Sequence, residues 1–276
     1  MWLHNKKTGA LFNTDWINED ARRKESNILY NKAESNKLTF KETGVLSGND
    51  VKEVDSKIIE HNKEVLKTLG DKFPQVRDYL GESGCQLDVL DHYPEGDEGS
   101  VMTTKLTYSN GRVLTSQIAI INTPENEHIF KSFDSLKQYE EQSCNENEAG
   151  VRWGMPCDKD KYGSYLLSHE YGHAVVNYIL DKNNREIWKD AKKYYESFES
   201  ADRALTRGMY QNFIRVAKKN GIKLDMSQLS AYGIGALEKG QYSEILAESF
   251  AHMMCSSSPN CWGQVMQLYL KELKLL

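Results

Sequence analysis

The chain has 276 residues, of which 39% are hydrophobic, and its 35 Lys and Arg against 40 Asp and Glu give a formal net charge of −5. This length allows one large domain with a sizeable core, and the acidic balance argues against a general nucleic-acid-binding protein. No apolar run approaches the roughly 18 residues that span a bilayer, and the polar start lacks the apolar core of a signal peptide. We therefore expect no nucleic-acid or membrane partner, and a cytoplasmic or virion-associated protein.

The five cysteines are too few and too irregularly spaced for a disulfide framework, and no C-x-x-C pair indicates a second zinc site. We expect free thiols in a reducing cytosol. After release from the cell, Cys144 with Cys157, or Cys255 with Cys261, are the alternative pairs.

The polar segment 1–44 is rich in Lys, Asn, Glu and Asp, and we expect a tail or connector without its own core, with residues 21–30 as a polar helix. Residues 45–276 are the predicted domain. From 49 to 80, apolar residues return at helical intervals that are interrupted at Gly70 and Pro74. This pattern predicts one long helix followed by a shorter one.

The next segment changes to the pattern of strands. Residues 86–90 are a predicted strand, and residues 101–121 a predicted hairpin that turns at Asn110-Gly111. An interaction sheet unrelated to catalysis would have the same signature. The polar residues 125–150 are expected to be a surface loop or a cover over a cleft, and residues 151–156 a short edge strand to which a substrate backbone could add.

Two histidines four residues apart, His169 and His173, flank Glu170. On a helix, residues i and i+4 share one face, so both imidazoles can bind a single Zn²⁺. Glu170 then lies beside the metal, where a carboxylate can take the proton of a water acidified by the ion. The motif predicts one zinc ion per chain and Glu170 as a general base.

The context of the motif is helical. Residues 165–180 have apolar residues at helical spacing, with Ser164 as the predicted N-cap and residues 181–184 as the predicted end. Residues 186–220 are predicted to be mostly helix, ended by Gly221.

A catalytic zinc needs a third protein ligand, and the positions where metzincins carry a further glycine and histidine hold aliphatic residues here. The predicted helix 242–254 is otherwise mostly apolar and carries Glu244 and Glu248 on one face. Two buried carboxylates require cationic or donor partners. We therefore predict Glu244 as the third ligand and Glu248 as a carboxylate that orients one of the histidines. His252 is the rival ligand.

These motifs resemble a known family. HEYGHAV at 169–175 and EILAESFAHM at 244–253 are similar to the two metal-site helices of gluzincin-type metallopeptidases related to the catalytic domain of anthrax lethal factor and to zincin domains of phage head-morphogenesis proteins. The resemblance covers about residues 150–276, and the opening residues 4–18 faintly resemble segments linked to phage minor head proteins. It implies an α+β, zincin-like fold: a small mixed sheet, an active-site helix and a mainly helical C-terminal part. The implied activity is zinc-dependent hydrolysis of a polypeptide substrate.

The same resemblance implies a role for Tyr232. The segment 229–233 is similar to one whose tyrosine faces the metal in this family, so Tyr232 would donate a hydrogen bond to the oxyanion. The twelve positions from Tyr232 to Glu244 exceed the expected spacing, and Tyr242 remains a rival.

Two other functions have the same motif. One is a phage assembly or structural protein that retains a zinc site without proteolysis, and the other is a zinc hydrolase of a small molecule. An open groove suits a polypeptide, whereas a closed pocket suits a small substrate.

Overall fold

The computed structural model describes residues 2–5, 10–13, 54–82, 86–93, 99–109, 112–189 and 198–276. The fold is α+β and mostly helical, with a small three-stranded sheet. Its elements are β1 (Trp2–Asn5), β2 (Ala10–Asn13), α2 (Ser56–Lys72), α3 (Pro74–Glu82), β3 (Gln86–Leu90), β4 (Met102–Ser109), β5 (Arg112–Ile121), α4 (Glu127–Phe130), α5 (Phe133–Cys144), α6 (Tyr165–Lys189), α8 (Phe198–Lys219), α9 (Ala231–Glu238), α10 (Tyr242–Cys255) and α11 (Cys261–Glu272).

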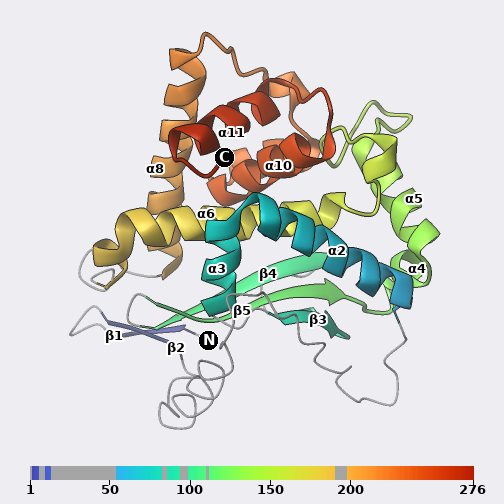
Figure 1. Ribbon diagram of the computed structural model, residues 1–276, viewed down its shortest axis with the longest axis horizontal. Helices are drawn as coiled ribbons and strands as arrows, with labels where there is room; N and C mark the ends of the chain where they lie inside the picture. Colours follow the sequence, from blue (N-terminus) through green and yellow to red (C-terminus); the bar gives the residue numbers. More distant parts are fainter. Residues whose placement is uncertain are drawn as a thin grey trace.

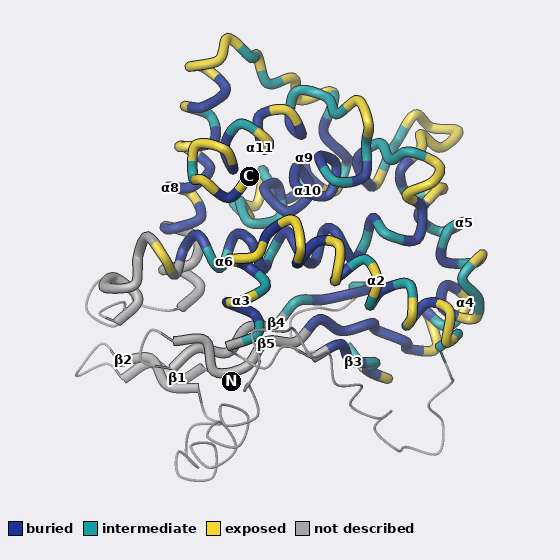
Figure 2. Tube along the Cα trace, in the orientation of Figure 1, coloured by how far each residue is buried: buried dark blue, intermediate teal, exposed yellow. Residues whose placement is uncertain are grey.

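The elements form layers around helix α6. Helices α2, α3 and α6 cover one face of the three-stranded sheet, and α8, α10 and α11 lie on the side of α6 away from the sheet (Figure 1). Figure 2 shows that most of α10, and of α6 up to residue 180, is buried. None of the helices that the structure describes is long and apolar enough to cross a membrane.

The sheet is mixed, with strand order β3-β5-β4. Strand β5 pairs parallel with β3 and antiparallel with β4, which confirms the predicted strand at 86–90 and the predicted hairpin. The hairpin tip, residues 110–111, lies outside the described residues. Alternate residues of β5 face opposite sides, so Ile118 and Ile120 join the main core while Ala119 and Ile121 pack with Leu90 on the other face.

The predicted pair of helices between 49 and 80 is confirmed as α2 and α3, but the predicted break at Gly70 is wrong. Helix α2 continues through Gly70 to Lys72 and ends at Phe73, which has non-helical backbone angles. Pro74 begins α3, where its missing N–H is not needed. Arg77 packs close above Gly70, since a Cβ there would lie 3.2 Å from the Arg77 side chain.

The prediction of a loop at 125–150 is wrong, because most of this segment forms α4 and α5. Ser132 caps α5 by accepting a hydrogen bond from the Ser135 N–H at 3.1 Å. The buried face of α5 consists of Leu136, Glu140 and Cys144, which follow one another at intervals of four residues. The sequence therefore has the spacing of a buried helix face, but one of the buried positions holds an acidic residue.

The predicted edge strand at 151–156 is also wrong, because these residues form a loop. The Arg152 carbonyl accepts a hydrogen bond from the Ala231 N–H at 2.7 Å, and its guanidinium donates to the carbonyls of Gly154 and Gln228, both at 3.0 Å. The loop thus bonds to the segment before α9 and not to a strand.

The helical prediction for 186–220 holds for the described part: α6 runs through Lys189, and α8 ends at Lys219 before Gly221, whose φ is +68°. Residues 190–197 are outside the described residues. In the N-terminal segment, β1 and β2 pair antiparallel, which the sequence did not indicate. The predicted helix at 21–30 also falls outside the described residues.

Candidate metal centre

The metal-binding motif lies on α6, whose N-terminus is held by a buried carboxylate. Glu140 of α5 accepts hydrogen bonds from the N–H groups of Gly163, Tyr165 and Leu166, at 2.5, 3.0 and 2.9 Å. Burial raises the pKa of Glu140 to about 7, although these N–H groups act in the opposite direction. An acceptor at this end satisfies N–H groups that have no partner within the helix.

Ser164 was predicted to be this cap, but its hydroxyl pairs with Nε2 of His61 at 2.9 Å. The predicted end of the helix at 181–184 is wrong as well, because α6 continues to Lys189.

Three side chains of two helices converge at the centre of the site. Nε2 of His169 lies 3.1 Å from Nε2 of His173, and Oε2 of Glu244 lies 3.3 Å from each of these nitrogens. These side chains are 11%, 16% and 20% exposed, respectively, so solvent reaches the cluster. Together they form a group that could hold a metal ion, and it is the one such group among the residues that the structure describes.

The charge balance within the triad favours an ionised glutamate. Burial alone would raise the pKa of Glu244, but His173 and His169 hold it well below its usual range. An anionic oxygen between two imidazole nitrogens is a donor set that attracts a divalent cation.

Close contact between α6 and α10 brings Glu244 to the histidines. Gly172 lies between the two histidines on α6 and faces Ala247 of α10. A Cβ on Gly172 would lie 2.8 Å from the Ala247 Cα and 3.0 Å from its carbonyl oxygen. Only glycine leaves room for this crossing, so the position of the third side chain depends on a residue that touches no ligand.

Glu170 follows His169 on α6 and is buried. Its carbonyl oxygen accepts a hydrogen bond from the Thr104 hydroxyl of β4 at 3.0 Å, which ties α6 to the sheet edge. The residue is 7% exposed, and its carboxylate makes no hydrogen bond with the residues that the structure describes. It is close enough to Tyr232 for its charge to act on that phenol.

Tyr232 lies at the triad and Tyr242 does not. The Tyr232 hydroxyl donates to Oε2 of Glu244 at 2.8 Å, and its ring centroid is 6.1 Å from that of His169. Burial and the Glu244 carboxylate raise the Tyr232 pKa, so the phenol keeps its proton at neutral pH. The ring of Tyr242 instead stacks on Tyr210, with centroids 5.0 Å apart.

Glu248 lies one turn beyond Glu244 and is buried. Its carboxylate accepts hydrogen bonds from the hydroxyl of Ser230 and, at 3.4 Å, from that of Tyr165. Burial raises its pKa to about 7, and the charge of His169 opposes this rise. Ser230 also caps α9 by accepting from the Gly233 N–H at 2.8 Å. Glu248 therefore connects the metal-site helices to the start of α9, which carries Tyr232.

His252, the rival ligand, has both ring nitrogens engaged elsewhere. Nδ1–H donates to the Pro156 carbonyl at 2.7 Å, and Nε2 accepts from the Asn260 N–H at 2.9 Å. Burial lowers its pKa, which favours the neutral ring. Among the described residues it joins no metal-binding group.

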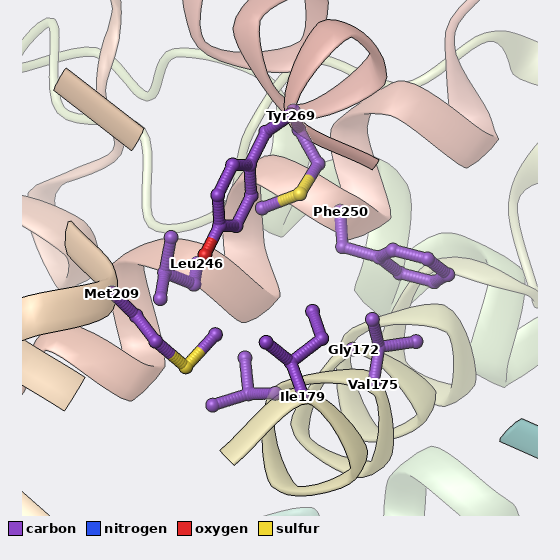
Figure 3. A pocket seen from close by; sticks show the side chains of 9 residues that line it. Gly172, Val175, Ile179, Met209, Leu246, Phe250 and Tyr269 are labelled. Atoms are coloured by element: carbon purple, nitrogen blue, oxygen red, sulfur yellow. The ribbon is translucent and has the colours of Figure 1, made fainter. Parts of the chain in front are cut away.

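The side of α6 away from the sheet packs against the C-terminal helices. Figure 3 shows apolar side chains of α6, α8, α10 and α11 gathered around a narrow gap, with the Tyr269 hydroxyl directed toward Leu246. The gap is too narrow for a water molecule. This dry packing holds α6 and α10 together behind the triad.

Comparisons of the chain with protein-family models, with curated proteins and with solved structures found no match.

Sequence reasoning overlooked Glu140, Gly172 and Ser230 as supports of the site. Glu140 could have been found from its spacing of four residues from Leu136 and Cys144. The role of Gly172 depends on a contact between two helices, for which the local sequence carries no signal.

Proposed function

We propose that the chain is a zinc-dependent endopeptidase with a zincin-like fold. The observation that carries this proposal is the triangle formed by His169, His173 and Glu244, whose edges measure 3.1, 3.3 and 3.3 Å. Tetrahedral zinc, with bonds of about 2.0–2.2 Å to nitrogen and oxygen, separates its ligand atoms by roughly 3.3–3.6 Å, close to these edges. The triangle thus has the dimensions of one face of a zinc tetrahedron, and the donor set is that of gluzincin-type sites.

The residues around the triangle supply the remaining parts of a hydrolytic site. His169, His173 and Glu244 would hold the zinc ion, which would supply Lewis-acid chemistry. Glu170 accepts the proton of the attacking water and returns it to the leaving amine. Tyr232 donates its phenolic hydrogen bond to the developing oxyanion and, being 45% exposed, meets the substrate from the solvent side.

The arrangement favours a catalytic over a structural site. A structural zinc is closed by four protein ligands, whereas a catalytic zinc keeps an open position. Three donors form the group here, and they are partly exposed. A general base such as Glu170 serves a site with an open position and has no role in a closed one. These features support hydrolysis over a scaffold with a zinc site.

Metal content tests the ligand set. The purified protein is expected to carry close to one zinc per chain, and Glu244→Ala to lose it. His252→Ala is the matched control on the same helix, and we expect it to retain the zinc. Retention in Glu244→Ala with loss in His252→Ala would refute the assignment.

Activity is tested with a diverse peptide library read by mass spectrometry. Wild type is expected to cut, and Glu170→Gln to keep the zinc but lose a factor of about 10² or more in rate. A variant that cuts as well as wild type would refute the general-base role. A zinc-loaded wild type that cuts neither peptides nor unfolded proteins would refute the endopeptidase assignment.

A further inference from the structure

Three cysteines from separate segments gather beside the metal-site helices. Cys144 ends α5, Cys157 lies in the loop before α6, and Cys255 ends α10. The side chains of Cys144 and Cys255 lie close enough to that of Cys157 to affect its ionisation. The Cys157 thiol donates to the Asp158 carbonyl at 3.4 Å, and the Cys255 thiol donates to the Ser168 hydroxyl at 3.5 Å. All three are free thiols in this structure; Cys144 and Cys255 are buried, while Cys157 is partly exposed.

The main chain brings two of these cysteines especially close. The N–H of Asp158, next to Cys157, donates to the carbonyl of Cys255 at 2.8 Å. By standard bond lengths this places the Cα atoms of Cys157 and Cys255 no more than about 8 Å apart, near the 4.4–6.8 Å that disulfides span. The Ser257 N–H also donates to the Asp158 carboxylate at 2.7 Å, which reinforces the contact. Neither Cys157 nor Asp158 forms a main-chain hydrogen bond with Cys144.

We propose that Cys157 and Cys255 are a disulfide site, which closes when the protein meets an oxidising thiol–disulfide buffer. Cys157, the more exposed thiol, loses its proton and attacks glutathione disulfide, which forms a mixed disulfide and releases one glutathione. The Cys255 thiol then attacks the Cys157 sulfur, which forms the protein disulfide and releases the second glutathione. Two protein thiols are oxidised, and one glutathione disulfide is reduced to two thiols that take both protons.

The surroundings indicate a structural bond and not a fast redox sensor. The neighbouring Cys144 thiol, together with burial, raises the pKa of Cys157, and the neighbouring Cys157 thiol, together with burial, raises the pKa of Cys255. Because the thiolate is the nucleophile, exchange is slow. A metal cluster is excluded by geometry: the three sulfurs do not form a group of ligand atoms within 4.8 Å of one another among the described residues.

The bond would fasten the two helices of the triad to each other. Cys157 precedes α6 by a short loop, and Cys255 is the last residue of α10, about 100 residues later. The Cys255 thiol also lies 3.5 Å from the hydroxyl of Ser168, the residue before His169. Closing so long a loop removes much of the freedom of the unfolded chain.

The experiment incubates the full chain with glutathione disulfide, traps free thiols and maps disulfides by mass spectrometry. We expect a Cys157–Cys255 link and a rise in Tm of about 5–15 °C that a reductant reverses. Cys144→Ser should keep the link and the rise. Cys157→Ser, a change at the more exposed position, should lose both.

Two outcomes would overturn the proposal. One is a Cys144–Cys157 link as the main product. The other is free Cys157 and Cys255 at equilibrium, under conditions in which the denatured chain is fully oxidised. Neither outcome depends on zinc or on peptide hydrolysis, so the proposal and the proposed function can fail separately.

Discussion

Replacing Gly172 by alanine tests the helix crossing that shapes the metal centre. The added Cβ would lie 2.8, 3.0 and 3.2 Å from the Cα, carbonyl oxygen and Cβ of Ala247, whereas carbon atoms in contact stay about 3.5–4.0 Å apart. Helices α6 and α10 must therefore separate by roughly 0.5–1 Å. Overpacking of this kind costs about 1–3 kcal/mol, and removing a helical glycine returns at most about 1 kcal/mol.

The same separation moves Glu244 away from the histidines. Because each 1.4 kcal/mol of strain in the bound geometry lowers affinity about tenfold, we expect zinc affinity to fall by roughly tenfold or more. Urea denaturation of the metal-free protein measures the change in the free energy of unfolding. Competition with a chromophoric chelator measures the zinc affinity. Gly208→Ala in α8 is the matched control, because its Cβ meets nothing within 4 Å, and it should stabilise by about 0.5–1 kcal/mol. A Gly172→Ala variant with wild-type stability and affinity would refute the crossing argument.

Three further substitutions test the supports of the site. Glu140→Gln should lower the free energy of unfolding by about 1–3 kcal/mol, because the N–H groups of Gly163, Tyr165 and Leu166 lose a charged acceptor. The control is Glu141→Gln at an exposed position, which should change the free energy of unfolding little. Equal effects of the two substitutions would contradict the capping role. The folded-state pKa of Glu248, about 7, exceeds its ordinary value of 4.5, so the folded protein binds the proton more tightly. Its contribution is complete below pH 4.5 and is lost as pH rises through 7, by about 3 kcal/mol in denaturation of the metal-free protein. Because the pKa of Glu140 is also raised to about 7, Glu248→Gln should remove about half of this pH dependence, and the double change with Glu140→Gln most of it. An unchanged pH dependence in Glu248→Gln would assign it to other groups. Tyr232→Phe should keep the stability and the zinc but slow peptide hydrolysis at least tenfold. Tyr242→Phe should hydrolyse peptides at the wild-type rate. Equal rates in wild type and both variants would remove Tyr232 from the mechanism.

The elements that the sequence predicted correctly are those with a clear local period. The strand at 86–90 and the hairpin at 101–121 follow from alternation and from the Asn110-Gly111 pair, and the two helices after residue 54 follow from apolar spacing. The triad was predictable because each of its parts is local. His169 and His173 share a helix face, and a glutamate on the buried surface of α10 needed a cationic partner.

The errors at 125–150 and 151–156 arose where a long-range contact decides the local structure. Residues 125–150 appear polar because Glu140 and its neighbours are acidic, yet Glu140 is buried and satisfied by N–H groups more than twenty residues away. Residues 151–156 include Val151 and Trp153, which favour strands, but the Arg152 carbonyl accepts from Ala231 at the start of α9. A pattern of side chains cannot indicate which distant backbone will supply a partner.

Three carboxylates at and around the triad, Glu244, Glu140 and Glu248, have two different functions. Glu244 faces solvent and two imidazoles, a position that leaves it ionised and ready for a cation. Among the described residues, Glu140 and Glu248 form no hydrogen bond with an imidazole nitrogen. Glu140 joins α5 to the start of α6, and Glu248 joins α10 to the start of α9. Because an isolated buried carboxylate is costly, each is retained only while its donors stay in place. The two acids thus couple the positions of α6, α9 and α10, so a change at either is expected to disturb the triad without touching it.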